Sequence, residues 1–186
     1  MQLEANDLRT AKRILVKLVE EALLEYEQNL AELDEPSNAD GHLNHLILQL
    51  KALLGEVLVE ALSILDEQSI QLYTYDSSEI AEIQIKRQQH TNTFWLFPRV
   101  NYCTCDQFKE GVLGVADQLQ TVSSTPSSEK LKNRYTCAHV LALRLAQVLR
   151  PAPITFKVEA VTKQQFKNLQ DRMYCSYSDI FKEGLG

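Results

Sequence analysis

Two short stretches decide the fold of this chain, YCTCD at residues 102–106 and YTCAHVLA at residues 135–142. Together they supply three thiols and one imidazole, which is the donor set of a closed Cys3His zinc site. The four candidate ligands are Cys103, Cys105, Cys137 and His139. We therefore predict one structural zinc ion, Zn²⁺, bound where the two half-motifs meet.

The two half-motifs need different local structures to present their ligands. In an extended segment Cys103 and Cys105 project to the same face, because side chains alternate along a strand. Residues two apart on a helix do not share a face, so we place Cys137 just before a helix and His139 in its first turn. The exposed amide groups at that helix start also favour the thiolate form of Cys137.

A disulfide, a catalytic pair and chance core cysteines are the three alternatives to a zinc site. A disulfide between Cys103 and Cys105 would close a strained ring, and a disulfide at Cys137 gives His139 no role. A catalytic pair of Cys137 and His139 has no evident orienting acid, and the two residues are too close in sequence for the usual dyad. Chance core cysteines do not account for the paired spacing. We assign no catalytic residue, and we give the fourth cysteine, Cys175, no role.

Composition limits the class of protein. The chain has 186 residues, of which 45% are hydrophobic and 24% charged, as expected for one folded domain with a helical appendage. Its formal net charge of -6 disfavours unaided binding to nucleic acid. No apolar run approaches the ~20 residues of a transmembrane helix, so we expect an intracellular protein without membrane contact.

The first third of the chain has helical periodicity. Residues 1–34 predict a long amphipathic helix, and the Pro and Gly residues of 35–41 predict a linker. A second apolar pattern from 43 to 65 is interrupted at Gly55, which predicts two helices meeting there. His42 and His45 lie three apart, but two histidines without a third ligand do not make a metal site. We place the zinc-finger domain at 42–186, with its zinc motif at 101–142.

The period then changes to that of strands. Residues 69–75 and 80–85 alternate around a turn at 76–78, which predicts a hairpin. The continuous apolar run 93–97 predicts a central strand with Trp95 in the core. After the motif, 154–158 predicts another strand, and Thr162 with Gln165 predicts a capping box that begins a helix. The expected fold class is α+β, a small antiparallel sheet of three to four strands with flanking helices.

The order Cys-x-Cys, a variable gap and Cys-x-His, followed by Ala142, resembles the SWIM zinc-finger domain. The resemblance covers roughly residues 53–149, including the helix and hairpin before the motif, and is closest to the stand-alone SWIM proteins of Shu complexes. Cys103, Cys105, Cys137 and His139 match the ligand positions of the family one for one. The long N-terminal helix and the length of the gap depart from the family pattern.

The resemblance implies a function that composition does not reveal. It implies a nuclear, non-catalytic subunit that binds RecA-like recombinase paralogues and promotes recombinase filament assembly during homologous-recombination DNA repair. Contact with DNA would then be indirect, through the partner, and there would be no small-molecule substrate. The chain has no Gly-rich phosphate loop and too few ligands for a RING domain, which agrees with an adaptor.

A competing hypothesis is direct binding of nucleic acid through the zinc module. Basic residues around the motif would contact phosphates, and the acidic net charge weighs against this function. The basic residues concerned are Lys86, Arg87, Arg99, Lys130, Lys132 and Arg134. The last three lie in a Ser/Thr-rich stretch, residues 118–134, which we expect to be a mobile loop.

Overall fold

The computed structural model describes residues 2–31, 39–67, 69–87, 90–113, 135–149 and 157–182. The helices are α1 (Gln2–Ala31), α2 (Ala39–Leu54), α3 (Glu56–Asp66), the π-helical turn η2 (Phe108–Val112), α5 (Ala138–Val148) and α6 (Lys163–Lys182). The strands are β1 (Ile70–Tyr75), β2 (Ser78–Arg87), β3 (His90–Leu96) and β4 (Lys157–Ala160). The expected α+β class is confirmed. No helix in the described part of the chain is long and apolar enough to cross a membrane.

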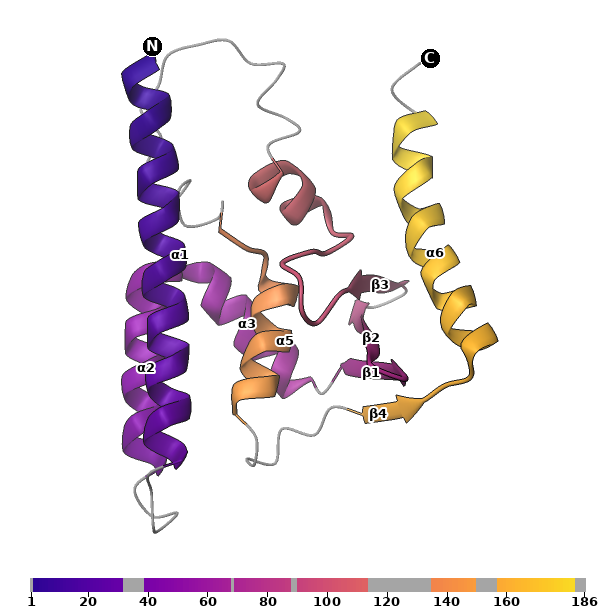
Figure 1. The fold of residues 1–186 in the computed structure, drawn as a ribbon, viewed down its shortest axis with the longest axis horizontal. Coiled ribbons are helices and arrows are strands. Elements are labelled where there is room, and N and C mark those ends of the chain that lie inside the picture. The colour runs from indigo at the N-terminus through magenta and orange to yellow at the C-terminus, as the bar shows by residue number, and fades with distance from the viewer. Residues whose placement is uncertain are drawn as a thin grey trace.

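The N-terminal helices α1 and α2 lie side by side and share one core (Figure 1). Val19 and Leu23 of α1 and Leu50 of α2 are almost completely buried. Helix α2 begins at Ala39, inside the stretch 35–41 where we expected a linker, and residues 32–38 lie outside the described part. Asp40 in the first turn is one reason for this early start, because an acidic side chain there interacts favourably with the helix dipole.

Gly55 separates α2 from α3, as the sequence predicts. Its amide donates to the Lys51 carbonyl at 2.9 Å, and its φ of 60° lies where a residue with a Cβ is disfavoured. The chain can therefore turn sharply between two helices that both contribute to the core.

The sheet has four strands in the order β3-β2-β1-β4. β1 and β2 form the expected antiparallel hairpin, in which Tyr75 pairs with Ser78 and Asp76 has a φ of 52° in the turn. β4 instead pairs parallel with β1, so the sheet is mixed and the expectation of an antiparallel sheet is corrected. The reason is the crossover between β3 and β4, which contains both half-motifs and α5 and returns the chain along the direction of β1. The strand was expected at 154–158; residues 154–156 lie outside the described part, and β4 begins at Lys157.

β3 is an edge strand, which corrects our prediction that the run 93–97 is central. Trp95 and Leu96 are nonetheless buried, because different elements cover the two faces of β3. Part of its outer edge is also covered, since Leu96 forms an isolated bridge with Cys103 and Thr104 donates its amide to the Trp95 carbonyl at 3.1 Å. The apolar run therefore predicted the burial of Trp95 and Leu96, but not the exposure of Thr93 or the order of the strands.

Helix α6 covers the face of the sheet that is opposite α3 and α5. The predicted capping box is present, with the Thr162 amide donating to Gln165 Oε1 at 2.8 Å and the Gln165 amide donating to Thr162 Oγ1 at 3.3 Å. Phe166 and Met173 of α6 pack in one cluster with Trp95. The predicted core position of Trp95 is thereby confirmed.

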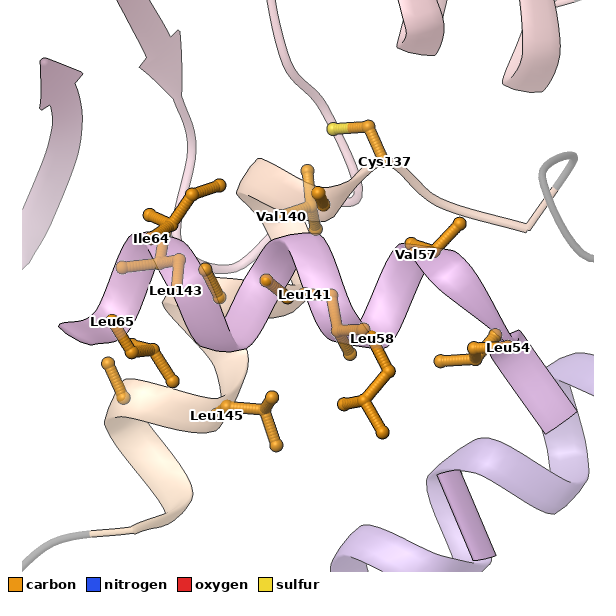
Figure 2. Close-up of a cluster of buried hydrophobic side chains, with 14 of the residues drawn as sticks. Leu54, Val57, Leu58, Ile64, Leu65, Cys137, Val140, Leu141, Leu143 and Leu145 are labelled. Carbon is orange, nitrogen blue, oxygen red and sulfur yellow. The ribbon is translucent and has the colours of Figure 1, made fainter. Parts of the chain in front are cut away.

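Helices α3 and α5 cross inside the larger core. Figure 2 shows side chains of α3 between those of α5, with Cys137 at the N-terminal end of α5. Only His139, Arg144 and Gln147 of α5 are polar, and nine of its eleven residues are buried. The second half-motif is therefore attached to the most deeply buried helix of the described chain.

Candidate metal centre

The four predicted ligands come together in one buried cluster. One ligand atom from each of Cys103, Cys105, Cys137 and His139 lies within 4.8 Å of all the others. All four residues are buried, and the three cysteines are free thiols. This group could hold one metal ion, and no other group of three or more such side chains occurs within the described ranges.

The first half-motif reaches this geometry through a bend rather than through strand alternation. Cys103 is in the bridge to Leu96, but the chain bends at Thr104 and Cys105, so our expectation of an extended segment is corrected. The bend lets the Cys105 amide donate to Cys103 Sγ at 3.4 Å and the Phe108 amide donate to Cys105 Sγ at 3.3 Å. Amide donors of this kind stabilise thiolates, which are the metal-binding form of cysteine.

The second half-motif has the predicted geometry. Cys137 is the N-cap residue of α5 with an extended backbone, and His139 lies in the first turn. The Leu141 amide donates to the Cys137 carbonyl at 3.1 Å, which begins the helix. The Phe94 ring of β3 packs on the His139 imidazole, with 4.0 Å between ring centroids. The helix start and the sheet together fix both ligands.

One polar atom at the site supports metal binding. The buried Nδ1 of His139 has no hydrogen-bond partner in the described structure. An unsatisfied buried polar atom typically costs about 1–3 kcal/mol, so such atoms are rare unless another interaction compensates. A metal ion would supply that interaction, and the donor set of three sulfurs and one nitrogen fits a tetrahedral ion.

The thiols influence each other's ionisation. Hydrogen bonds from the Cys103 and Cys137 thiols hold the pKa of Cys105 far below its ordinary value. Hydrogen bonds to Cys105 and Cys137, with burial, raise the pKa of Cys103. The bond to Cys103 favours the Cys137 thiolate, but the bond to Cys105 and burial outweigh it and raise the pKa of Cys137 to about 12. Three thiolates at this place therefore require a cation, as metal binding would provide.

Two amide side chains join the half-motifs outside the ligand set. Asn101 donates to the Tyr135 carbonyl at 2.9 Å and accepts from the Thr136 hydroxyl at 3.0 Å. Gln107 Oε1 accepts a hydrogen bond of 3.4 Å from the Ala138 amide at the start of α5. Our sequence reasoning missed both residues. Their positions two before Cys103 and two after Cys105 were the only available signal, and that spacing predicts no pairing.

A further cluster attaches the N-terminal helix to the same site. Both terminal nitrogens of the Arg144 guanidinium donate to the Glu20 carboxylate, Nη1 to Oε1 and Nη2 to Oε2, the latter at 2.6 Å. The Tyr135 hydroxyl donates to Glu20 Oε1 at 3.0 Å. Burial and the nearby Glu20 charge raise the pKa of Tyr135, so its hydroxyl stays a donor at neutral pH. Because Tyr135 is two residues before Cys137, this cluster links α1 directly to the metal-binding segment.

The remaining candidate residues are not brought to the metal centre. His42 and His45 belong to no cluster of metal-binding side chains in the described structure. Lys86 is exposed, and Arg99 is paired with Glu79 at 3.6 Å. The side chains of Arg87 and Cys175 lie outside the described part. The whole stretch 118–134, with Lys130, Lys132 and Arg134, also lies outside it.

Comparison with known proteins found no match. No family model, no curated protein and no solved structure matches this chain. The resemblance to the SWIM domain accordingly rests on the motif residues and the elements around them.

Proposed function

We propose that the Cys3His cluster binds one structural zinc ion. The observation that carries this proposal is the convergence of three buried sulfurs and one buried imidazole from two segments far apart in sequence. Zinc is favoured over other metals, since a closed tetrahedral set of thiolates and imidazole suits it and leaves no open position for chemistry. Bound zinc would hold the β3–η2 segment against the start of α5.

We further propose that the chain is a nuclear adaptor subunit of the SWIM type in a Shu-like complex. In this function it binds RecA-like recombinase paralogues and promotes recombinase filament assembly on single-stranded DNA, without catalysing a reaction itself. The match of the four ligands to the SWIM pattern supports the proposal. Large apolar side chains left exposed on α1 and α2, among them Ile14, Leu18 and Leu48, agree with a subunit completed by a partner.

Co-expression with a recombinase paralogue tests this function. Size-exclusion chromatography with light scattering should show a defined complex, whereas the chain expressed alone should self-associate. His139→Ala should abolish the complex, because the fold around the metal site is lost. Charge reversal at Lys130 and Lys132 should leave the complex nearly intact.

A stable monomer with no affinity for any recombinase paralogue would contradict the adaptor function. Salt-dependent binding of that monomer to DNA in a filter assay would then favour a nucleic-acid-binding module. Normal paralogue binding by His139→Ala would likewise contradict the adaptor function as proposed and favour the nucleic-acid-binding module.

A further inference from the structure

A groove of about 360 Å³ follows the contact between α1 and α2. Leu18 and Ala22 line it from α1, and Ala52 and Leu53 line it from α2. Leu18 keeps 43% of its surface exposed, whereas the adjacent Val19 is completely buried. The two helices thus bury one apolar stripe between them and leave a shallow apolar groove, in which Leu18 and Ala52 are exposed, Leu53 is half-buried and Ala22 is buried.

Small side chains give this groove the shape that suits a helix. Ala22 and Ala52 project little from their helices, so a third helix could approach both backbones closely between them. Leu18 and Leu53 then form apolar walls on the two sides. A row of leucine or methionine side chains, spaced three and four residues apart on the incoming helix, matches such a trough.

The groove also has an acidic border. Glu21 and Glu25 line it one helical turn apart on the same face of α1. Glu21 pairs with Lys17 at 3.4 Å, but both side chains are mostly exposed, so the pair is weak and readily exchanged. Glu25 has no ion-pair partner among the residues that the structure describes. The border can therefore accept two cationic side chains.

We propose that this groove is a docking site for a basic amphipathic helix of a partner protein. The apolar side of that helix would lie on Leu18, Ala22 and Ala52, and its Lys or Arg residues would pair with Glu21 and Glu25. The inference rests on the proposed function, because it assigns to the partner subunit the surface that it covers. It gives that subunit a recognisable chemistry, an apolar stripe with a basic flank.

A designed helical peptide with one leucine face and one lysine face serves as the probe, and its leucine-glutamate counterpart serves as the comparison. In fluorescence anisotropy the lysine peptide should bind more tightly than the glutamate peptide, and added salt should weaken the binding of the lysine peptide. Leu18→Asp should reduce its affinity about tenfold or more, as charge in the centre of an interface does. The matched control Leu24→Asp, which is on α1 and 53% exposed but outside the groove, should have no effect.

Charge reversal is the decisive variant. Glu21→Lys combined with Glu25→Lys should reverse the preference, so that the glutamate peptide binds better. Equal binding of both peptides, or equal effects of Leu18→Asp and Leu24→Asp, would overturn the groove as a docking site. If circular dichroism shows that Leu18→Asp unfolds the chain, Ala52→Arg replaces it, because a large cationic side chain at this exposed position obstructs the groove and repels the lysine peptide.

A second arm separates this inference from the proposed function. A recombinase paralogue that binds the wild-type chain should lose that binding with Leu18→Asp and keep it with Leu24→Asp. If it binds the wild type and Leu18→Asp equally, the groove is overturned while the adaptor function stands. If no paralogue binds the wild type but the peptides discriminate as expected, the adaptor function fails and the groove stands.

Discussion

His139 is the residue whose surroundings are hardest to account for by packing alone. Its ring is buried against Phe94, yet Nδ1 has no partner in the described structure. A core histidine normally satisfies its nitrogens, because an unpaired buried donor or acceptor destabilises the fold. The three sulfurs beside the ring supply no cation, so a bound metal ion is the simplest way to satisfy both the imidazole and the thiolates.

Replacement of one ligand should therefore remove the metal. We expect Cys105→Ser to lower bound zinc from one per chain to a small fraction, measured by elemental mass spectrometry after dialysis against zinc-free buffer. Cys175→Ser is the matched control, since it makes the same chemical change at a cysteine outside the predicted ligand set and should retain full occupancy. Full zinc content in Cys105→Ser would contradict the assignment.

At the residue scale the sequence predicted which side chains converge but not what supports them. Residue type and spacing are local properties, so Cys103, Cys105, Cys137 and His139 could be identified as candidate ligands from the motif alone. Asn101 and Gln107 are ordinary polar residues whose partners lie more than 30 positions away. Only the folded chain reveals that they join the half-motifs.

Helix α1 is attached to the metal-binding segment by charge as well as by apolar packing. Glu20 accepts from both Arg144 and Tyr135, so one carboxylate connects α1, α5 and the residues just before Cys137. The Arg144 and Glu20 side chains are each about 40% exposed, which limits the strength of the ion pair by solvent screening. The bidentate geometry, in contrast, strengthens the ion pair, because two parallel hydrogen bonds form at once.

A double-mutant cycle measures this attachment. Glu20→Gln, Arg144→Met and the combined variant should reveal a coupling of about 1 kcal/mol in the free energy of unfolding. The control is the exposed pair of Lys17 and Glu21, which should couple by only about 0.3–0.5 kcal/mol. A coupling no larger than that of the control would mean that apolar contacts alone hold α1 in place.

Gly55 gives a prediction for the junction of α2 and α3. Gly55→Ala should destabilise the fold by about 1–3 kcal/mol, because its positive φ is strained for a residue with a Cβ. Gly41→Ala is the matched control, since Gly41 lies within α2 and has no atom within 4 Å of an added Cβ. That change should be neutral or stabilising by up to about 1 kcal/mol. Chemical denaturation gives the free energy of unfolding of both variants. Equal destabilisation by Gly55→Ala and Gly41→Ala would refute the role of Gly55.

Elements defined by local patterns were predictable, whereas their arrangement was not. Alternation and a turn identified the β1–β2 hairpin, and Thr162 with Gln165 identified the start of α6. The parallel pairing of β4 joins Gln71 to Lys157, far apart in sequence, and no local pattern specifies it. The edge position of β3 was not predicted, because Trp95 and Leu96 are buried on the two faces of this strand as they would be in a central strand.

The described part of the molecule has two apolar clusters, and they differ in how they contact the candidate metal centre. The larger one includes the three candidate ligand cysteines together with core residues of α1, α2, α3 and α5. The smaller one lies between α6 and the opposite face of the sheet. A bound metal would therefore stabilise the larger cluster directly and the smaller one mainly through the sheet.

Removal of zinc should destabilise the larger cluster more than the smaller one. Structural zinc can contribute ~10–16 kcal/mol of apparent binding free energy, comparable to the stability of a whole domain. We expect a chelator to increase amide hydrogen exchange first in η2 and α5 and only later in α6. Mass spectrometry measures this exchange. Excess zinc should restore protection. Unchanged exchange in α5 after complete zinc removal would show that the core does not depend on the metal.

The parallel pairing of β4 with β1 also imposes an order on biosynthesis. One edge of β1 has no partner until the ribosome has made both half-motifs, α5 and the strand that begins at Lys157. During that interval Tyr73 and Trp95 also lack the helix α6 that covers them. An unpaired strand edge beside uncovered aromatic rings is a surface on which nascent chains aggregate and chaperones bind. We therefore expect a message truncated after α5 to encode all four candidate ligands yet to yield an aggregation-prone fragment, because β4 and α6 are missing.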